Sequence, residues 1–301
     1  MIDLTKIQTE RENPASRQFS SLSIRQAMTL MNEEDAHAVS CIPAAFDQIE
    51  EVIRHTSAAL QRGGRLIYMG AGTSGRLGLL DAVECPPTFG VDYQMVHGLI
   101  AGGKDAFVKA REGAEDHPEE GREDLKAISF CDSDFLLGIA ASGRTPYVLG
   151  GLEYANELGA KCGALVCTLH SPIAEICPLT IEAIPGPEVL TGSTRLKAGT
   201  VTKLILNMIS TISMKEMGKI YRNYMVDLKL SNQKLQERGI SIIQSVTSCE
   251  REVAENKLRD AGGNVKIAII MVLLGVSVEE ARHSLAQAKG RIDWIKEEAD
   301  G

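Results

Sequence analysis

Two short stretches, each joining an apolar strand to a helix through glycines and hydroxyl residues, constrain this chain most. In the first, the apolar residues 66–69 lead into residues 70–76, which read GAGTSGR. Glycines let a backbone turn tightly and approach a ligand closely, and the free N–H groups at a helix N-terminus favour an anion. Because Thr73 and Ser74 add hydroxyl donors, the stretch is typical of a phosphate-binding loop.

The second stretch follows about 70 residues later, where the apolar run 135–141 leads into residues 142–146, which read SGRTP. Such a run is typical of a buried parallel strand, and Ser142, Thr145 and Pro146 suit the start of the next helix. The pair of stretches predicts one phosphate held from two sides. Its predicted ligands are the hydroxyls of Thr73, Ser74, Ser142 and Thr145 and the backbone N–H groups of Gly75 and Gly143.

Strands and helices alternate between residues 65 and 185, which predicts a parallel sheet with helices on both faces. The predicted strands are 65–69, 91–96, 134–140, 162–168 and 179–184. In such sheets ligands bind beyond the carboxyl ends of the strands, where both glycine stretches begin. Ahead of the sheet, residues 1–20 resemble an arm. Residues 24–62 are predicted to be helical, with a possible cap at Ser23, a break near Pro43 and one buried face at Ile42, Phe46, Ile49 and Ile53.

The last part of the chain is predicted to be helical. A long helix follows residues 192–194 and runs to about residue 221, and a second helical stretch is expected within 222–238. From about residue 240, Ala254, Leu258, Ala261 and Gly263 match Ala281, Leu285, Ala288 and Gly290 at an offset of 27. Each copy reads as a helix, a glycine stop and a new helix, although two Ala-rich helices can also match by chance.

Composition excludes several classes of protein. The net charge of −8 and the lack of a Lys/Arg run argue against nucleic-acid binding. No basic segment followed by an apolar core marks a signal peptide, and the longest apolar run, 267–276, is too short to span a membrane. The seven cysteines are scattered, without the spacing of a metal site, which indicates reduced thiols in a cytoplasmic protein.

Residues 70–75 also fit the Gly-x-Gly-x-x-Gly pattern of dinucleotide sites, but the next predicted strand does not end in the acidic residue that a ribose would need. Two carboxylates remain as catalytic candidates. Glu84 ends the first predicted helix among apolar neighbours, where burial would raise its pKa, and Glu115 lies in a polar loop. Taken singly, each also fits a solvated surface acid. Lys197 could meet an anionic ligand or be a solvated helix lysine.

The two glycine stretches resemble the loops of SIS (sugar isomerase) domains. Nearly the whole chain resembles the N-acetylmuramic acid 6-phosphate etherases. The similar segments are 9–16 (TERENPAS), 80–89 (LDAVECPPTF), 100–103 (IAGG), 112–116 (EGAED), 191–200 (TGSTRLKAGT) and 223–227 (NYMVD). Glu12 is a departure, because in this family Arg is expected to run directly into Asn-Pro.

The resemblance implies a SIS-type three-layer αβα sandwich with a five-stranded parallel sheet and a small C-terminal helical subdomain. The expected division is an N-terminal arm with helices at 1–60, a SIS domain at 61–238 and a small helical, UBA-like subdomain at 239–301. It also implies two partners, a phosphosugar substrate and a second copy of the chain in a homodimer, and neither a nucleic acid nor a membrane.

The family's reaction cleaves the D-lactyl ether of N-acetylmuramic acid 6-phosphate, giving N-acetylglucosamine 6-phosphate and D-lactate without a metal or organic cofactor. The family's acid/base residue falls on Glu84 and its second glutamate on Glu115. Two alternatives stay open, a regulatory phosphosugar-binding protein and an aldose–ketose isomerase. Whether Glu84 serves its own subunit or the partner in a homodimer is also open.

Overall fold

The structure, a computed structural model, describes residues 8–109, 111–230 and 232–299. It divides the chain into two compact units, of which the first comprises residues 1–83 and 93–210 and the second residues 84–92 and 211–301. Helix α3 (Gly72–Phe89) and helix α8 (Lys197–Glu216) each run from the first unit into the second.

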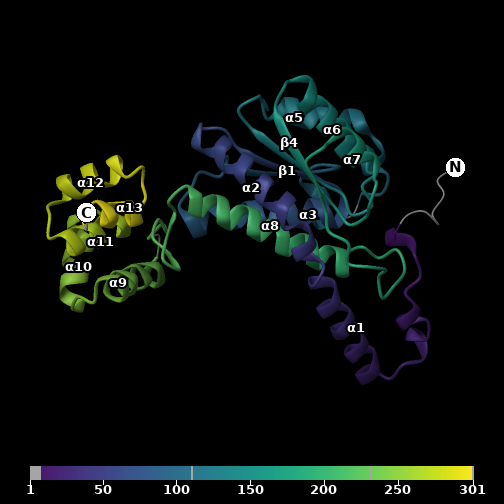
Figure 1. Ribbon diagram of the computed structural model, residues 1–301, viewed down its shortest axis with the longest axis horizontal. Coiled ribbons are helices and arrows are strands. Elements are labelled where there is room, and N and C mark those ends of the chain that lie inside the picture. The colour runs from purple at the N-terminus through teal and green to yellow at the C-terminus, as the bar shows by residue number, and fades with distance from the viewer. Residues whose placement is uncertain (1–7, 110, 231, 300–301) are drawn as a thin grey trace. The chain divides into compact units, whose positions relative to one another are not determined.

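A five-stranded parallel sheet in the order β2-β1-β3-β4-β5 forms the centre of the first unit (Figure 1). Its strands are β1 (Leu66–Gly70), β2 (Val96–Ile100), β3 (Phe135–Ile139), β4 (Lys161–Val166) and β5 (Thr180–Glu182). β1 and β3 are buried along their whole length, as their apolar sequences predict. The predicted α/β fold class is confirmed.

The prediction was wrong for the position of the second strand. Residues 93–95 form a turn, and β2 begins only at Val96. The half-buried residues His97 and Gly98 interrupt the apolar pattern of this strand, so the turn before it looked equally strand-like. The corrected strand ends at Ile100 and still offers no acidic residue for a ribose.

Helices cover both faces of the sheet (Figure 1). On one face lie α5 (Pro118–Ala127), α6 (Pro146–Glu157) and α7 (Pro172–Ile176), and on the other lie α2 (Phe46–Gln61), α3 and α8. A Cβ at Gly151 of α6 would touch Met69, whereas a Cβ at Gly78 of α3 would touch Tyr68. Because consecutive strand residues point to opposite faces, these contacts confirm the three layers.

Over the described residues 8–39, the N-terminal segment forms three 3-10 turns followed by helix α1 (Ile24–Val39). The turns are η2 (Gln8–Glu10), η3 (Pro14–Ser16) and η4 (Phe19–Ser21). Ser23 caps α1 in a capping box with Gln26, as predicted. The break near Pro43 is the 3-10 turn η5 (Ile42–Ala45), which leads into α2.

The predicted buried face of the N-terminal helices was wrong at one position. Ile42, Ile49 and Ile53 are buried, but Phe46 is 50% exposed. Residues 42–45 form a 3-10 turn instead of an α-helical one, so the helical phase assumed across Phe46 does not hold.

The loop between β2 and α5 contains the short helix α4 (Asp105–Val108) and the 3-10 turn η6 (Ala114–Asp116). After β5, residues 183–196 lead into α8. This helix ends at Glu216, earlier than predicted, because Gly218 takes a positive φ of 70°.

The second unit combines a small hairpin with helices. The hairpin pairs β6 (Ile220–Tyr221) with β7 (Tyr224–Met225), where the sequence had predicted helix. The helices are α9 (Gln233–Thr247), α10 (Arg251–Asp260), α11 (Val265–Leu274), α12 (Val278–Gln287) and α13 (Ile292–Ala299). The domain boundary predicted between residues 238 and 239 falls inside α9. The longer of the two segments that make up the second unit begins at residue 211.

The predicted repeat corresponds to two similar helix–glycine–helix pairs, α10–α11 and α12–α13. Gly263 and Gly290 both have a φ of 81°. The N–H of Gly263 donates to the Leu258 carbonyl at 2.9 Å, and the N–H of Gly290 donates to the Leu285 carbonyl at 2.8 Å. The repeat in sequence is therefore also a repeat in backbone conformation.

The buried side chain of Lys266, in α11, ties the second unit together. Its Nζ donates to the carbonyls of Gly218 and Gly290 and to Asp227, at 2.8, 3.1 and 2.7 Å. Burial lowers the pKa of Lys266, although the Asp227 carboxylate opposes this effect.

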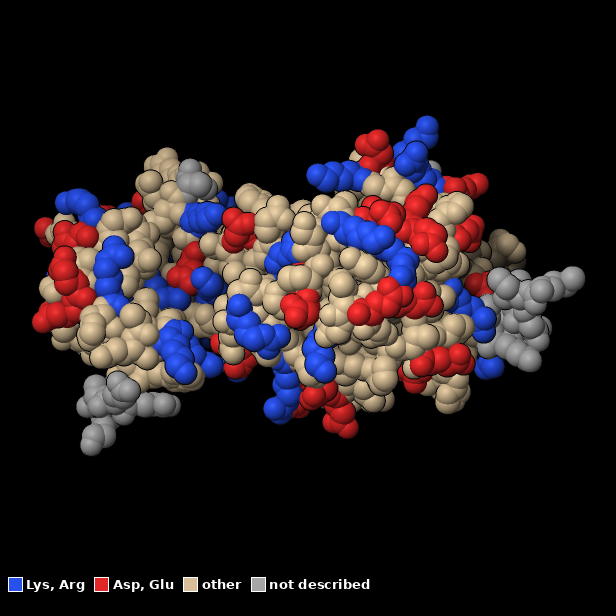
Figure 2. All heavy atoms as spheres, turned by 90° about the horizontal axis from the view of Figure 1, so that it is seen from above, with Lys and Arg blue, Asp and Glu red and all other residues tan. Residues whose placement is uncertain are grey.

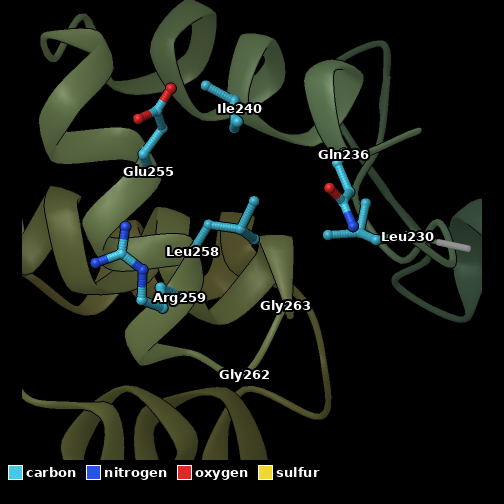
Figure 3. Close-up of a pocket in the computed structure, with 8 residues that line it drawn as sticks. All are labelled: Leu230, Gln236, Ile240, Glu255, Leu258, Arg259, Gly262 and Gly263. Atoms are coloured by element: carbon cyan, nitrogen blue, oxygen red, sulfur yellow. The ribbon is translucent and has the colours of Figure 1, made fainter. Parts of the chain in front are cut away.

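A hollow of about 640 Å³ also lies in this unit, bordered by α9, α10 and the glycines before α11 (Figure 3).

Acidic and basic side chains are interspersed on the face seen in Figure 2, which shows no broad basic surface there. Within the part of the chain that the structure describes, every helix is too short or too polar to serve as a membrane span.

Candidate functional site

The first glycine stretch forms a tight turn between β1 and α3. A Cβ at Gly70 would lie 2.8 Å from the nitrogen of Gly75, and one at Gly75 would lie 2.6 Å from the oxygen of Gly70. Only glycine permits this approach, and Gly72 adopts a φ of 52° at the start of α3. Thr73 and Ser74 are half-buried in the first turn of the helix, where backbone N–H groups face outward.

The second glycine stretch connects β3 to α6. Thr145 is the N-cap residue of α6 and Pro146 its first residue, as predicted. The Thr145 hydroxyl makes no capping hydrogen bond to its own helix. Gly143 has a φ of 64°, and a Cβ there would lie 2.3 Å from the Cβ of Ser171.

The two glycines predicted as backbone donors already use their N–H groups within the chain. The N–H of Gly75 donates to the Ala71 carbonyl at 3.1 Å, and the N–H of Gly143 donates to the Ala140 carbonyl at 2.9 Å. Their role in this structure is therefore to shape the loops, and the hydroxyl residues remain as the candidate phosphate ligands.

The sheet brings the two loops side by side. β1 and β3 are paired neighbours, with Gly70 opposite Ile139 at the carboxyl edge. Two hollows lie there. One of about 160 Å³ is lined by Gly72 and Arg76 of the first loop and by Glu115, among others. One of about 320 Å³ is lined by Ser142 and Arg144 of the second loop together with residues of the N-terminal arm.

Two arginines hold the loop that carries Glu115. Arg76 donates to the carbonyls of Phe107 and Ala106 at 2.8 and 2.7 Å, and Arg111 donates to the carbonyl of Gly102 at 2.8 Å. Glu115 lies in η6 with an exposed side chain and borders the same hollow as the first glycine loop. The structure thus brings Glu115 to the first loop.

Glu84 lies far along α3 from the first loop. At about 1.5 Å per residue, it is roughly 15 Å from Ser74 along the helix axis. The helix continues past Glu84 through Pro86 and Pro87 to Phe89, so the prediction that it ends at Glu84 was wrong. The side chain of Glu84 is exposed, and so are Leu80 and Val83, at 43% and 52%. The expected apolar burial of Glu84 within one chain is therefore not present.

The buried carboxylate of α3 is Asp81, which the sequence analysis missed. It is 8% exposed, and it accepts hydrogen bonds from Tyr68, Asn207 and Ser210 at 2.9, 3.0 and 3.2 Å. Burial raises the pKa of Asp81 from 3.8 to about 6, against the opposing effect of these donors. Asp81 falls on the same helical stripe as the buried Gly78 and other buried positions of α3, a signal that was present in the sequence.

Lys197 is neither a free anion ligand nor a solvated lysine. It is 1% exposed, and its Nζ donates to Glu34 at 2.6 Å and to the Pro187 carbonyl at 3.0 Å. Asn13 of the arm also donates to Glu34, at 2.7 Å. Burial raises the pKa of Glu34, but the hydrogen bonds from Lys197 and Asn13 outweigh it and lower the pKa. This ion pair joins the arm, α1 and α8.

The seven cysteines are free thiols. Among the described residues, no group of three or more His, Cys, Asp or Glu side chains is arranged to hold a metal ion.

Comparisons with known proteins agree with this architecture. A protein from Bacteroides fragilis, assigned as a phosphosugar isomerase involved in capsule formation, superimposes with a TM-score of 0.50 at 22% identity, covering 64% of this chain and 91% of that one. Residues 47–156 match the glucokinase regulatory protein N-terminal SIS domain. Residues 222–262 match the C-terminal lid domain of glucokinase regulatory protein. The first unit therefore has the SIS fold.

Two curated relatives match nearly the whole chain. A Francisella tularensis subsp. holarctica protein named N-acetylmuramic acid 6-phosphate etherase is 53% identical, over 97% of this chain and 99% of that protein. A Vibrio cholerae protein named N-acetylmuramic acid 6-phosphate etherase 2 is 50% identical, over 98% of this chain and 96% of that protein. The chain belongs to the N-acetylmuramic acid 6-phosphate etherase family.

Proposed function

We propose that this chain is a carbon–oxygen lyase that cleaves the D-lactyl ether of N-acetylmuramic acid 6-phosphate in the recycling of cell-wall sugars. The products are N-acetylglucosamine 6-phosphate and D-lactate. One observation carries the proposal from geometry: two glycine-shaped, hydroxyl-bearing loops meet at the carboxyl edge of the sheet, and a glutamate borders the first of them. The names of the full-length relatives supply the substrate.

The phosphate is held by Thr73 and Ser74 of the first loop and by Ser142 and Thr145 of the second. Their placement at two neighbouring helix starts supports this assignment, as does the Thr145 hydroxyl, which does not cap its own helix. Each hydroxyl contributes about 1 kcal/mol, and more where the hydrogen bond is charge-assisted. Ser74→Ala and Ser142→Ala should therefore each raise KM at least severalfold, and an unchanged KM in both would remove this assignment.

The chemistry proceeds by elimination and then hydration. The sugar opens to its aldehyde, which acidifies the proton on C2. A base removes that proton, the double bond forms between C2 and C3, and lactate leaves C3 with the electron pair of the broken C–O bond. Water then adds to C3 and a proton returns to C2. The substrate's own carbonyl accepts the electrons, so the route requires no added cofactor.

Two glutamates share the proton transfers. Glu84 takes the C2 proton and donates one to the leaving oxygen, and Glu115 activates the water. Glu84→Gln should abolish nearly all lactate release while leaving ligand affinity intact. Glu115→Gln should slow hydration more than elimination, so that the unsaturated aldehyde accumulates. Equal loss of elimination and of C2 proton exchange in both variants would contradict this division of roles.

We propose further that the chain is a homodimer with composite sites, in which Glu84 acts on the substrate of the partner. The roughly 15 Å along α3 between Ser74 and Glu84 supports this arrangement. The exposed Leu80 and Val83 beside Glu84 also support it, because a second copy would shield them and the carboxylate from water.

Subunit exchange tests the composite site. Inactive Glu84→Gln protein is mixed with inactive protein that carries both Ser74→Ala and Ser142→Ala, and exchange is verified by mass. If Glu84 acts on the partner's substrate, the mixed dimer contains one intact site and regains lactate release. No recovery after verified exchange means that each chain completes its own site.

The free thiols of all seven cysteines support a reducing, cytoplasmic setting for this reaction. The match to a glucokinase regulatory protein domain favours one alternative, a regulatory protein that binds a phosphosugar without converting it. Incubation with N-acetylmuramic acid 6-phosphate decides between the two. Stoichiometric D-lactate supports the lyase, whereas binding without release of lactate supports the regulator.

A further inference from the structure

We infer that the N-terminal arm is a wall of the phosphate subsite, and that Arg11 of the arm and Arg144 of the second loop pair with the phosphate monoester. The inference rests on the proposed phosphosugar function and assigns a role to the arm, which the reaction itself leaves unused. The carrying observation is the hollow of about 320 Å³ that Gln8, Arg11, Ser142, Arg144 and His170 line together.

The arm is anchored on both sides of Arg11. On one side, the backbone N–H of Leu169 donates to the Gln8 side chain at 3.2 Å. On the other side, Asn13 donates to Glu34 at 2.7 Å and to the Pro187 carbonyl at 3.2 Å. Because a preorganised group loses little entropy when a ligand binds, a side chain on a backbone segment held between two anchors is suited to binding.

Conformation within the arm adds to this anchoring. The N–H of Arg11 donates to the Gln8 carbonyl at 3.3 Å, and Thr9 between them is 3% exposed. The carboxylate of Glu10 approaches the backbone at Gly192, where a Cβ would lie 2.9 Å from Glu10 Oε2. The arm therefore makes contacts with three separate parts of the first unit around the hollow.

The charges at the hollow favour an anion. Arg11 and Arg144 are both exposed, and neither forms an ion pair with a carboxylate of the described residues. Two cations that border one hollow repel each other until an anion lies between them. Of the acids in this region, Glu12 pairs with Arg17 at 3.1 Å, Glu182 accepts the backbone N–H of His170 at 2.9 Å, and Glu10 lies against Gly192.

A phosphate monoester fits this lining better than a single carboxylate does. It has three terminal oxygens, each of which can accept more than one hydrogen bond, so the two guanidinium forks can add to the hydroxyls of both loops. The hollow volume lies near the lower end of small-molecule sites. Because β1 and β3 are adjacent, the phosphate can lie between the two loops, and the attached sugar would extend toward Glu115.

The test measures binding of N-acetylglucosamine 6-phosphate by calorimetry, which does not depend on turnover, alongside the kinetics of lactate release. Arg11→Gln and Arg144→Gln should each weaken binding by about tenfold or more and raise KM similarly, with kcat changed by less than about twofold. Arg11→Lys should recover part of the affinity. Arg17→Gln is the matched control, because that arm residue pairs with Glu12 and lies outside the hollow; its affinity should equal that of the wild type.

Unchanged affinity for N-acetylglucosamine 6-phosphate in both Arg11→Gln and Arg144→Gln overturns the inference. So does a loss confined to the lactyl-bearing substrate, which would assign the arginines to its carboxylate. Wild-type protein that binds the phosphosugar and releases no lactate contradicts the proposed function instead, and the calorimetric comparison of the variants still tests the subsite.

Discussion

Asp81 makes the stability of the first unit depend on pH, and replacing it with asparagine should remove that dependence. Its carboxyl group is buried among Tyr68, Asn207 and Ser210, and burial raises its pKa from 3.8 to about 6. The folded chain therefore binds this proton more tightly than the unfolded chain does. The contribution of this group to the free energy of unfolding is fully present below about pH 4 and is lost as the pH rises to about 6.

The magnitude follows from the size of the shift. At about 1.36 kcal/mol per unit of pKa, the rise corresponds to up to about 3 kcal/mol. Asp81→Asn keeps the shape of the side chain and stays neutral at every pH. The Tyr68 hydroxyl can turn so that its oxygen accepts a hydrogen bond from the new amide N–H. Relative to the wild type, the variant should therefore gain up to about 3 kcal/mol between pH 4 and pH 7.

Urea unfolding followed by far-ultraviolet circular dichroism measures this difference at each pH. Fluorescence is the wrong probe, because the single tryptophan, Trp294, lies in the second unit. Asp134→Asn provides a control of opposite sign. Burial raises the pKa of Asp134, but the hydrogen bonds from Arg65 outweigh it and lower the pKa, so that variant should lose stability above about pH 4. A flat difference between Asp81→Asn and the wild type would refute the reasoning.

Two further substitutions test the loop and the ion pair. Gly143→Ala should lower stability and raise KM, because the new Cβ would lie 2.3 Å from Ser171 in addition to the strain of a positive φ. Gly159→Ala, which has a φ of 70° and open space around it, should cost only about 1 kcal/mol. Thermal melts and the kinetics of lactate release measure both variants. Lys197→Met leaves Glu34 without its ion-pair partner in a mostly buried site, so we expect a loss of about 3 kcal/mol in urea unfolding. Lys215→Met, at an exposed pair, should change little.

Local patterns in the sequence predicted the parts of the fold that local physics determines. The apolar runs of β1 and β3 are buried on both faces, so their strands were found. β2 was displaced because only its ends are fully buried and His97 and Gly98 break its pattern. The glycine stops at Gly263 and Gly290 were found because a positive φ leaves a strong mark on residue choice.

The candidate site was less predictable because long-range contacts assemble it. Gln8 and Leu169, which anchor the arm at the second loop, are 161 residues apart in sequence, and no local pattern encodes their contact. Glu84 was expected among apolar neighbours, but Leu80 and Val83 lie on the exposed side of α3, and the buried side carries Asp81. The prediction counted apolar neighbours along the chain without considering their helical phase. It therefore took Glu84 instead of Asp81 as the buried carboxylate.

The central claim is that this chain breaks the bond between C3 of the sugar and the lactyl oxygen. Incubation with N-acetylmuramic acid 6-phosphate in water enriched in oxygen-18, followed by mass spectrometry of both products, tests it most directly. We predict that D-lactate keeps its original ether oxygen and that the solvent oxygen appears in the C3 hydroxyl of N-acetylglucosamine 6-phosphate. Solvent oxygen in the lactate, or no lactate at all, would contradict the account.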